Sequence, residues 1–275
     1  MSRFALAALL ALLTAAPGPA VANAFLALCG DPSAPAAQVA GACRRALEAG
    51  GLTRSQEAAA ALNLGAAFLE LGQPRQAEEA YDRALAVDPR AALALGGRAR
   101  AREELGKAPL AAVDWNRAVD LAPRDAELRT GRGAFRLRAG NAQGALEDFD
   151  LALRASPRDR DATFNRGLAL AALGRDAEAE QAFSAVLRAD QGDVGAWLNR
   201  ARIRASRDRA AALADFDQAV ARAPEWSTPW FERGVLLEAM GRSDEAARDF
   251  RRAFELGHSS AYLTEKMLEL GQPNR

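Results

Sequence analysis

The chain has 275 residues, and its 36 basic and 36 acidic side chains give a formal net charge of zero. This balance provides no excess of positive charge from which to predict a nucleic acid or an anionic lipid as a partner. Alanine and leucine dominate while aromatic residues make up 6% of the chain, a composition that favours helices over strands. We therefore expect an all-α protein.

The first residues have the order of features found in a secretory signal peptide. Arg3 is followed by the apolar run FALAALLALLTAA, and Ala22 and Ala24 then form an A-x-A cleavage pattern before Phe25. The apolar run is shorter than the roughly 20 residues needed to cross a bilayer. The pattern predicts a signal peptide over residues 1–24 and a periplasmic or secreted mature chain without a transmembrane segment. A buried N-terminal helix is the alternative.

Two cysteines, Cys29 and Cys43, follow the cleavage pattern. In an exported protein disulfides form and persist, so we expect the two to pair as a structural disulfide. A redox pair needs a closer spacing. Lipidation of Cys29 is a further alternative because FLALCG loosely resembles a lipoprotein signal, although Leu28 stands where a small residue is expected.

From residue 58 the sequence repeats with a period of 34 residues. Glycine, aromatic residues and proline each keep a fixed column, for example Gly72, Gly106, Gly140 and Gly174, then Tyr81, Trp115, Phe149, Phe183, Phe216 and Phe250, then Pro89, Pro123 and Pro157. The fifth unit is one residue shorter. The spacing predicts six units over residues 58–91, 92–125, 126–159, 160–193, 194–226 and 227–258.

These columns resemble the tetratricopeptide repeat family. The first unit carries the family's residues at Leu64, Gly65, Phe68, Ala77, Tyr81, Ala84 and Pro89. The resemblance implies two antiparallel helices per unit, stacked into a right-handed superhelical solenoid because one hairpin cannot bury its apolar face alone. The glycine column would end each first helix in a left-handed conformation, with Asp208 as a tolerable substitute in the fifth unit.

Both ends of the array are predicted to be caps. Residues 25–57 are predicted to form half a repeat, with one helix that corresponds to the second helix of a repeat. The segment before it is expected to be a non-helical strap, held against this helix by the disulfide, in place of a first helix. Residues 259–275 read as a terminal helix that Ser260 caps at its start.

Two features of the first helices are unusual. Gly167 lies in the middle of an apolar helix, which predicts a close approach of the two helices of its unit. Arginines also recur on the apolar stripe, at Arg98, Arg132, Arg166, Arg200 and Arg233, and one turn later at Arg102, Arg136 and Arg204. A charge at a packed seam needs a partner, so we predict internal networks with the polar residues that flank the aromatic column, namely Asp114, Asn116, Asp148, Asp150, Asp215 and Asp217. Solvated charges are the alternative.

No set of residues typical of an enzyme emerges. His258 is the only histidine, so HExxH and similar metal sites are not available, and the sequence contains neither a phosphate-binding loop nor a G-x-S-x-G motif. We predict a protein that is not an enzyme and has no metal or cofactor. An enzyme, or enzyme subunit, acting on envelope polymers is the alternative, with Glu103, Glu104 and Glu127 as the carboxylates to test.

The resemblance implies instead a concave face, lined by the first helices, that binds an extended peptide or a partner helix. By register this face presents Asn63, Arg100, Glu103, Glu127, Arg138, Asp161, Asn165, Asn199, Arg202 and Glu232. The asparagines occupy one recurrent position, where a side-chain amide can donate to and accept from a peptide backbone; neutral surface residues are the alternative. The sequence thus predicts an exported scaffold or adaptor, and a lipoprotein scaffold is the variant that differs only in its anchoring.

Overall fold

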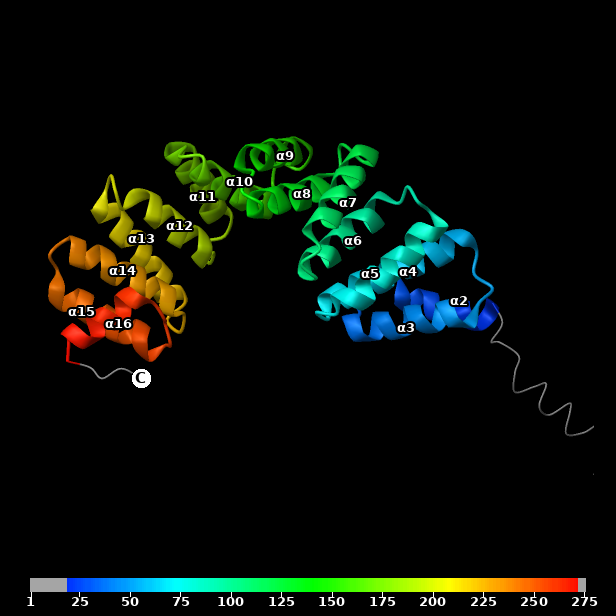
Figure 1. Ribbon diagram of the computed structural model, residues 1–275, viewed down its shortest axis with the longest axis horizontal. Helices are drawn as coiled ribbons and strands as arrows, with labels where there is room; N and C mark the ends of the chain where they lie inside the picture. The colour runs from blue at the N-terminus through cyan, green and yellow to red at the C-terminus, as the bar shows by residue number, and fades with distance from the viewer. Residues whose placement is uncertain (1–18, 272–275) are drawn as a thin grey trace, which may run out of the picture. The chain divides into compact units, whose positions relative to one another are not determined.

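The computed structural model describes residues 19–271, and this part of the chain contains only helices, α2 to α16, joined by short turns (Figure 1). Most of the predicted signal peptide, residues 1–18, lies outside the described residues. No helix within residues 19–271 combines the length and the apolar character that crossing a bilayer would require.

The chain forms two compact units, and the boundary between them in the sequence lies between Phe135 and Arg136, inside α8. The first unit contains α2 (Pro19–Cys29), α3 (Ala36–Ala49), α4 (Arg54–Glu70), α5 (Pro74–Val87), α6 (Ala92–Glu104), α7 (Ala108–Leu121) and most of α8 (Ala126–Arg138). The second contains α9 (Ala142–Ala155), α10 (Arg160–Ala172), α11 (Asp176–Ala189), α12 (Val194–Arg204), α13 (Arg209–Arg222), α14 (Ser227–Ala239), α15 (Ser243–Glu255) and α16 (Ala261–Glu269).

Each predicted repeat is a helix hairpin whose inner turn is set by the glycine column. Positive φ angles, which only glycine adopts at low cost, occur at Gly72, Gly106, Gly140, Gly174 and Gly241. The expectation for the fifth unit was wrong, because Asp208 has a φ of −144°. With one residue fewer in this turn, Asp208 instead becomes the N-cap of α13, and its side chain accepts a hydrogen bond from the backbone N–H of Ala211.

In three of the hairpins a glycine of the first helix, Gly65, Gly167 or Gly234, meets the aromatic ring of the second. A Cβ added at Gly167 would lie 2.9 Å from Cε1 and Cζ of Phe183, a separation that real Cβ atoms do not tolerate. Phe183 is fully buried. The close approach predicted at Gly167 is therefore confirmed, and the stabilisation from packing this ring outweighs the roughly 1 kcal/mol that a mid-helix glycine costs.

The N-terminal cap differs from its prediction in one respect. Residues before Cys29 form helix α2 rather than a strap, and α2 and α3 make a hairpin of their own, adjacent to α4. Helix α2 runs across the predicted cleavage point, and Ala22 in it is fully buried. The predicted disulfide between Cys29 and Cys43 is present and joins the two helices.

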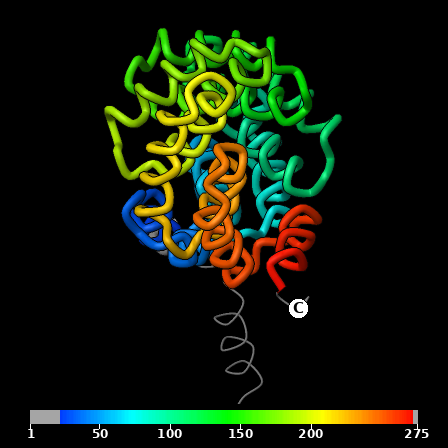
Figure 2. Tube along the Cα trace, turned by 90° about the vertical axis from the view of Figure 1, so that its left-hand side faces the viewer, coloured from blue at the N-terminus to red at the C-terminus, as the bar shows by residue number. Residues whose placement is uncertain are grey.

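At the other end, α16 lies beside α15 in both views of the chain (Figures 1 and 2). Ser260 caps α16 as expected, its hydroxyl accepting from the N–H of Leu263. Leu263 and Met267 are buried against the last hairpin, so α16 covers apolar surface that the sixth repeat would otherwise expose.

Candidate functional site

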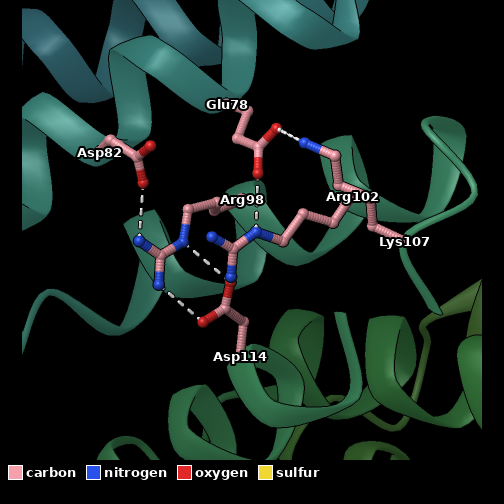
Figure 3. A network of polar contacts seen from close by, with 6 residues as sticks. All are labelled: Glu78, Asp82, Arg98, Arg102, Lys107 and Asp114. Atoms are coloured by element: carbon pink, nitrogen blue, oxygen red, sulfur yellow. Dashed lines mark hydrogen bonds and ion pairs between the residues drawn. The ribbon is translucent and has the colours of Figure 1, made fainter. Parts of the chain in front are cut away.

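In the second, third, fifth and sixth repeats arginines on the apolar stripe pair with almost fully buried aspartates, which confirms the predicted networks. In the fourth repeat Arg166 pairs with Asp150, whose side chain is 42% exposed. In the second repeat Asp114 is 2% exposed and accepts from Nε and Nη2 of Arg98 at 2.8 and 2.7 Å, and from Nη1 of Arg102 at 2.6 Å (Figure 3). Glu78 of the preceding repeat accepts from Nε of Arg102 at 2.9 Å. The charges therefore lie inside the stack and not in solvent.

The same arrangement recurs in the second unit. Asp215 accepts two hydrogen bonds from Arg200 and one from Arg204, and Asp249 accepts two from Arg233. Asp249 was not among the predicted partners, although its place directly before the aromatic column was the signal that could have identified it. Arg136 pairs with Asp148 at 2.8 Å.

Each arginine of the first column also reaches back to the preceding repeat. Its partner there always lies directly after the aromatic residue, and the five pairs are Arg98–Asp82, Arg132–Asn116, Arg166–Asp150, Arg200–Ser184 and Arg233–Asp217. We call this set the arginine ladder. It links each of these hairpins to the one before it.

The electrostatics of the ladder agree with this pairing. The hydrogen bond to Asp114 raises the pKa of Arg98 although burial alone would lower it, and the same holds for Arg233 beside Asp249. Burial raises the pKa of Glu78, but hydrogen bonds from Lys107 and Arg102 outweigh it and the net pKa is lowered. These groups therefore stay ionised near neutral pH.

The ten predicted binding residues lie on the first helices α4, α6, α8, α10, α12 and α14, and together they are called here the first-helix face. In the first unit the amide of Asn63 is half-buried and donates to the backbone carbonyl of Cys29 at 3.1 Å. Arg100 and Glu127 are exposed, and both act electrostatically on the hydroxyl of Tyr81. Glu103 accepts a hydrogen bond from the indole Nε1 of Trp115 at 2.6 Å.

In the first unit two aromatic rings, of Tyr81 and Trp115, occupy the space that a side chain at the asparagine position would need, a feature not predicted from the sequence. The position held by asparagine in repeats one, four and five is Gly97 in repeat two and Gly131 in repeat three. A Cβ at Gly97 would lie 2.2 Å from Tyr81, and one at Gly131 would lie 2.3 Å from Trp115. Repeats whose preceding aromatic is the smaller phenylalanine keep a polar residue there, so the glycines were the signal.

In the second unit three of the predicted residues are in contact. Arg202 on α12 pairs through Nε and Nη2 with both carboxylate oxygens of Glu232 on α14, and its Nη1 donates to Oδ1 of Asn199. Asn199 in turn donates to the carbonyl of Gly195 at 2.8 Å. A polar cluster therefore bridges two successive first helices.

The remaining predicted residues lie apart from that cluster. Asn165 is half-buried on α10, while Asp161, in the first turn of α10, and Arg138, at the end of α8, are exposed. His258 is half-buried and its ring stacks on Phe231 with centroids 4.2 Å apart. Burial lowers the pKa of His258 and the charge of Glu232 opposes that effect, so the ring is neutral at pH 7 and acts as packing surface.

Within the described residues no group of three histidine, cysteine, aspartate or glutamate side chains is placed to hold a metal ion. What the geometry offers instead, in each unit taken by itself, is a set of hydrogen-bonding and charged side chains on consecutive antiparallel hairpins. This arrangement defines a helical-repeat scaffold, a class of protein in which each hairpin contacts only its neighbours.

The chain belongs to the tetratricopeptide repeat family. The family profile described as "Tetratricopeptide repeat" matches residues 62–126, 136–194 and 196–261, well over half of the sequence. A search of curated protein sequences finds no match.

Several solved structures share the fold. PilF of Pseudomonas aeruginosa aligns with a TM-score of 0.70 at 21% identity, covering 78% of this chain and 99% of its own. PilW, described as a type IV pilus biogenesis factor, aligns with a TM-score of 0.70 at 22% identity, covering 76% and 97%. YrrB, described as a TPR protein with an unusual peptide-binding site, aligns with a TM-score of 0.54 at 25% identity, covering 67% and 94%. At these identities the likeness establishes the fold.

Proposed function

We propose that the protein is an exported, non-catalytic scaffold whose first-helix face binds an extended segment of a protein partner. The binding residues we propose are the ten predicted from the sequence, with Asn165, Asn199, Arg202 and Glu232 as the part in the second unit that a ligand backbone and its charged side chains would contact. PilW and YrrB support the class of function, because their descriptions concern pilus biogenesis and peptide binding.

The observation that carries this proposal is the contact made by Asn63. Its amide group donates to the main-chain carbonyl of Cys29, at the end of α2. The first asparagine of the recurrent position thus already binds a backbone carbonyl, which is the interaction a peptide ligand would require from its equivalents Asn165 and Asn199. A side-chain amide can both donate and accept, so this position suits a ligand of variable sequence.

Site-specific photocross-linking tests the proposal. A benzophenone amino acid at Asn165 is expected to cross-link a partner in the exported compartment, and the same probe at the exposed Arg251 on α15 serves as the matched control. Replacing Arg202 and Glu232 together with alanine should reduce the Asn165 adduct. Equal labelling from both probe positions, or an adduct indifferent to the Arg202 and Glu232 changes, would contradict a specific face.

Export is a separate part of the proposal, supported by the N-terminal pattern and by the disulfide between Cys29 and Cys43. The intact mass of the protein from its native host decides it. A chain beginning at Phe25 supports cleavage and release, a lipidated chain beginning at Cys29 supports the anchored variant, and a chain retaining residues 1–24 in the cytoplasm contradicts export.

The absence of catalysis is likewise proposed. Glu103 accepts from Trp115, and Glu104 lies 3.9 Å from Nε of Arg100, so both acids have structural contacts. Loss of a hydrolytic activity on wall or glycan polymers in the Glu103→Gln, Glu127→Gln double variant would show that the scaffold is also an enzyme.

A further inference from the structure

An open cavity of about 460 Å³ lies in the second unit, between the second helices α11 and α13 and over the start of α12. Arg188 enters it from α11, Arg200 from α12 and Arg222 from α13, and none of the described residues that line it is acidic. Ser184 and Gln218 add a hydroxyl and an amide. The cavity is therefore strongly cationic within a chain whose net charge is zero.

The nearby acids are committed to other arginines. Asp215 neutralises Arg200, which also donates to the hydroxyl of Ser184. Glu180 pairs with Arg204 and Arg207. Arg200 therefore belongs to the arginine ladder, and its charge is balanced.

Arg188 and Arg222 are not balanced in this way. Arg188 is exposed and forms no hydrogen bond or ion pair with any described residue. Arg222 is oriented by the carbonyl of Gln191 and by Gln218, neither of which carries charge, and its Nη2 is left without a partner among the described residues. Two uncompensated guanidinium groups thus converge on one cavity.

Trp197 also lines the cavity. Its Nε1 donates to the carbonyl of Gln191 at 2.9 Å, and the guanidinium groups of Arg200 and Arg222 lie over its ring at 4.8 and 5.3 Å from the centroid. Stacking on tryptophan holds Arg222 in place and so lowers the entropy lost when it binds an anion.

This cavity is distinct from the first-helix face. On α12, at 3.6 residues per turn, Trp197 and Arg200 point roughly opposite to Asn199 and Arg202. Arg188 lies near the end of α11, and Arg222 is the last residue of α13, the corresponding helix of the next repeat. A second open cavity, which shares Ser184 and Arg188 and adds Gln181 and Glu180, continues along α11.

We propose that this cavity binds an acidic peptide segment of a protein partner, with carboxylates on Arg188 and Arg222. Guanidinium groups bind carboxylate oxygens in pairs and are the usual choice for exposed oxyanion recognition. The amide of Gln181, in the adjoining cavity, favours a peptide over a phosphate polymer or a lipid surface, because it can donate to and accept from a backbone. The amide oxygen of Gln218 accepts from Arg222, so Gln218 adds only its N–H donors. The proposal does not depend on the first-helix face, since a partner could bind either site alone.

Fluorescence anisotropy with a labelled octapeptide of alternating glutamate and glycine tests the site. The full mature chain is expected to bind it, to bind the glutamine–glycine counterpart at least tenfold more weakly, and to lose affinity when salt rises from 20 to 500 mM because screening shortens the range of charge interactions. Arg188→Glu should weaken binding about tenfold or more, since it replaces a charge-assisted hydrogen bond with repulsion.

Arg222→Glu should weaken binding to a similar extent. If the Arg222→Glu variant misfolds, Arg188→Glu still decides the test, because Arg188 makes no hydrogen bond or ion pair with a described residue. Arg251→Glu is the matched control, and it should leave octapeptide binding unchanged. Equal loss in Arg251→Glu, or no loss in Arg188→Glu, would overturn the site. Tighter binding of polyphosphate or phosphatidylglycerol vesicles than of the octapeptide would overturn the assignment to a peptide.

Discussion

Removal of the Asp114 carboxylate should lower the free energy of unfolding by a large amount for so small a side chain. It accepts three hydrogen bonds from Arg98 and Arg102, whose side chains are only 17% and 14% exposed. Asp114→Ala would leave both guanidinium groups partly buried, each with one acid remaining, Asp82 or Glu78. Removing one member of a buried pair costs 3–5 kcal/mol, and the remaining acids place this case at the lower end, at about 3 kcal/mol.

The first repeat supplies a matched repair. At the positions of Arg98, Arg102 and Asp114 it carries Leu64, Phe68 and Ala80, all buried. Copying them with Arg98→Leu, Arg102→Phe and Asp114→Ala replaces the ion network by an apolar packing that this chain already uses. Because exchanging a buried ion network for apolar side chains is often neutral or stabilising, the triple variant should unfold within about 1 kcal/mol of the parent or above it.

Urea unfolding followed by circular dichroism at 222 nm measures both effects. Asp114→Ala should also lower Tm by roughly 6–12 °C at 2–4 °C per kcal/mol. The control is Asp82→Asn, because the Asp82 side chain is 52% exposed and its pair should contribute less than about 1 kcal/mol. An Asp114→Ala variant no less stable than Asp82→Asn, or a triple variant less stable than Asp114→Ala, would refute a buried ion network at this place.

Three further outcomes can be measured on the same protein. Gly167→Ala should destabilise the protein by about 1–3 kcal/mol through overpacking against Phe183. The control is Gly41→Ala, whose added Cβ meets nothing within 4 Å and which should stabilise the protein by up to about 1 kcal/mol. Equal shifts of the urea midpoint in the two variants would contradict the close approach at Gly167. Replacing Cys29 and Cys43 with alanine should cost about 3 kcal/mol, since the cross-link spans 14 residues, and a reductant should then have no further effect on the urea midpoint. Burial raises the pKa of Tyr81, and the hydrogen bond to Glu238 raises that of Tyr262, so absorbance at 295 nm should show tyrosinate only above pH 10 in the folded protein. Because the raised pKa favours the neutral phenol, the stability from these groups is complete below pH 10 and is lost as pH rises further; titration of either tyrosine at its ordinary pKa would refute this.

The repeat columns could be predicted from the sequence because each one is required by local geometry. Glycine at a left-handed turn and glycine against an aromatic ring, as at Gly167, leave no other residue as a good substitute. The arginine ladder was predictable for a related reason, since a charge on an apolar stripe requires a counter-charge close by.

Other features depend on packing that the one-dimensional pattern does not encode. Helix α2 lacks the repeat's columns and lies against α3 and α4, so it was expected as a strap. The pairing of Arg202 with Glu232 depends on how α12 and α14 align, and both residues were predicted without their contact. Asp208 changed role because a one-residue deletion moved it from the turn to the N-cap.

The arginine ladder also bears on how such a chain changes length over evolutionary time. Every repeat from the second to the fifth carries an arginine directed at the unit before it and, directly after its aromatic residue, a polar acceptor available to the unit behind it. Each hairpin thus carries both an arginine and an acceptor for the arginine of the next hairpin. An unequal crossover that duplicated or removed one whole repeat would therefore still place an arginine beside an acceptor at the new junction.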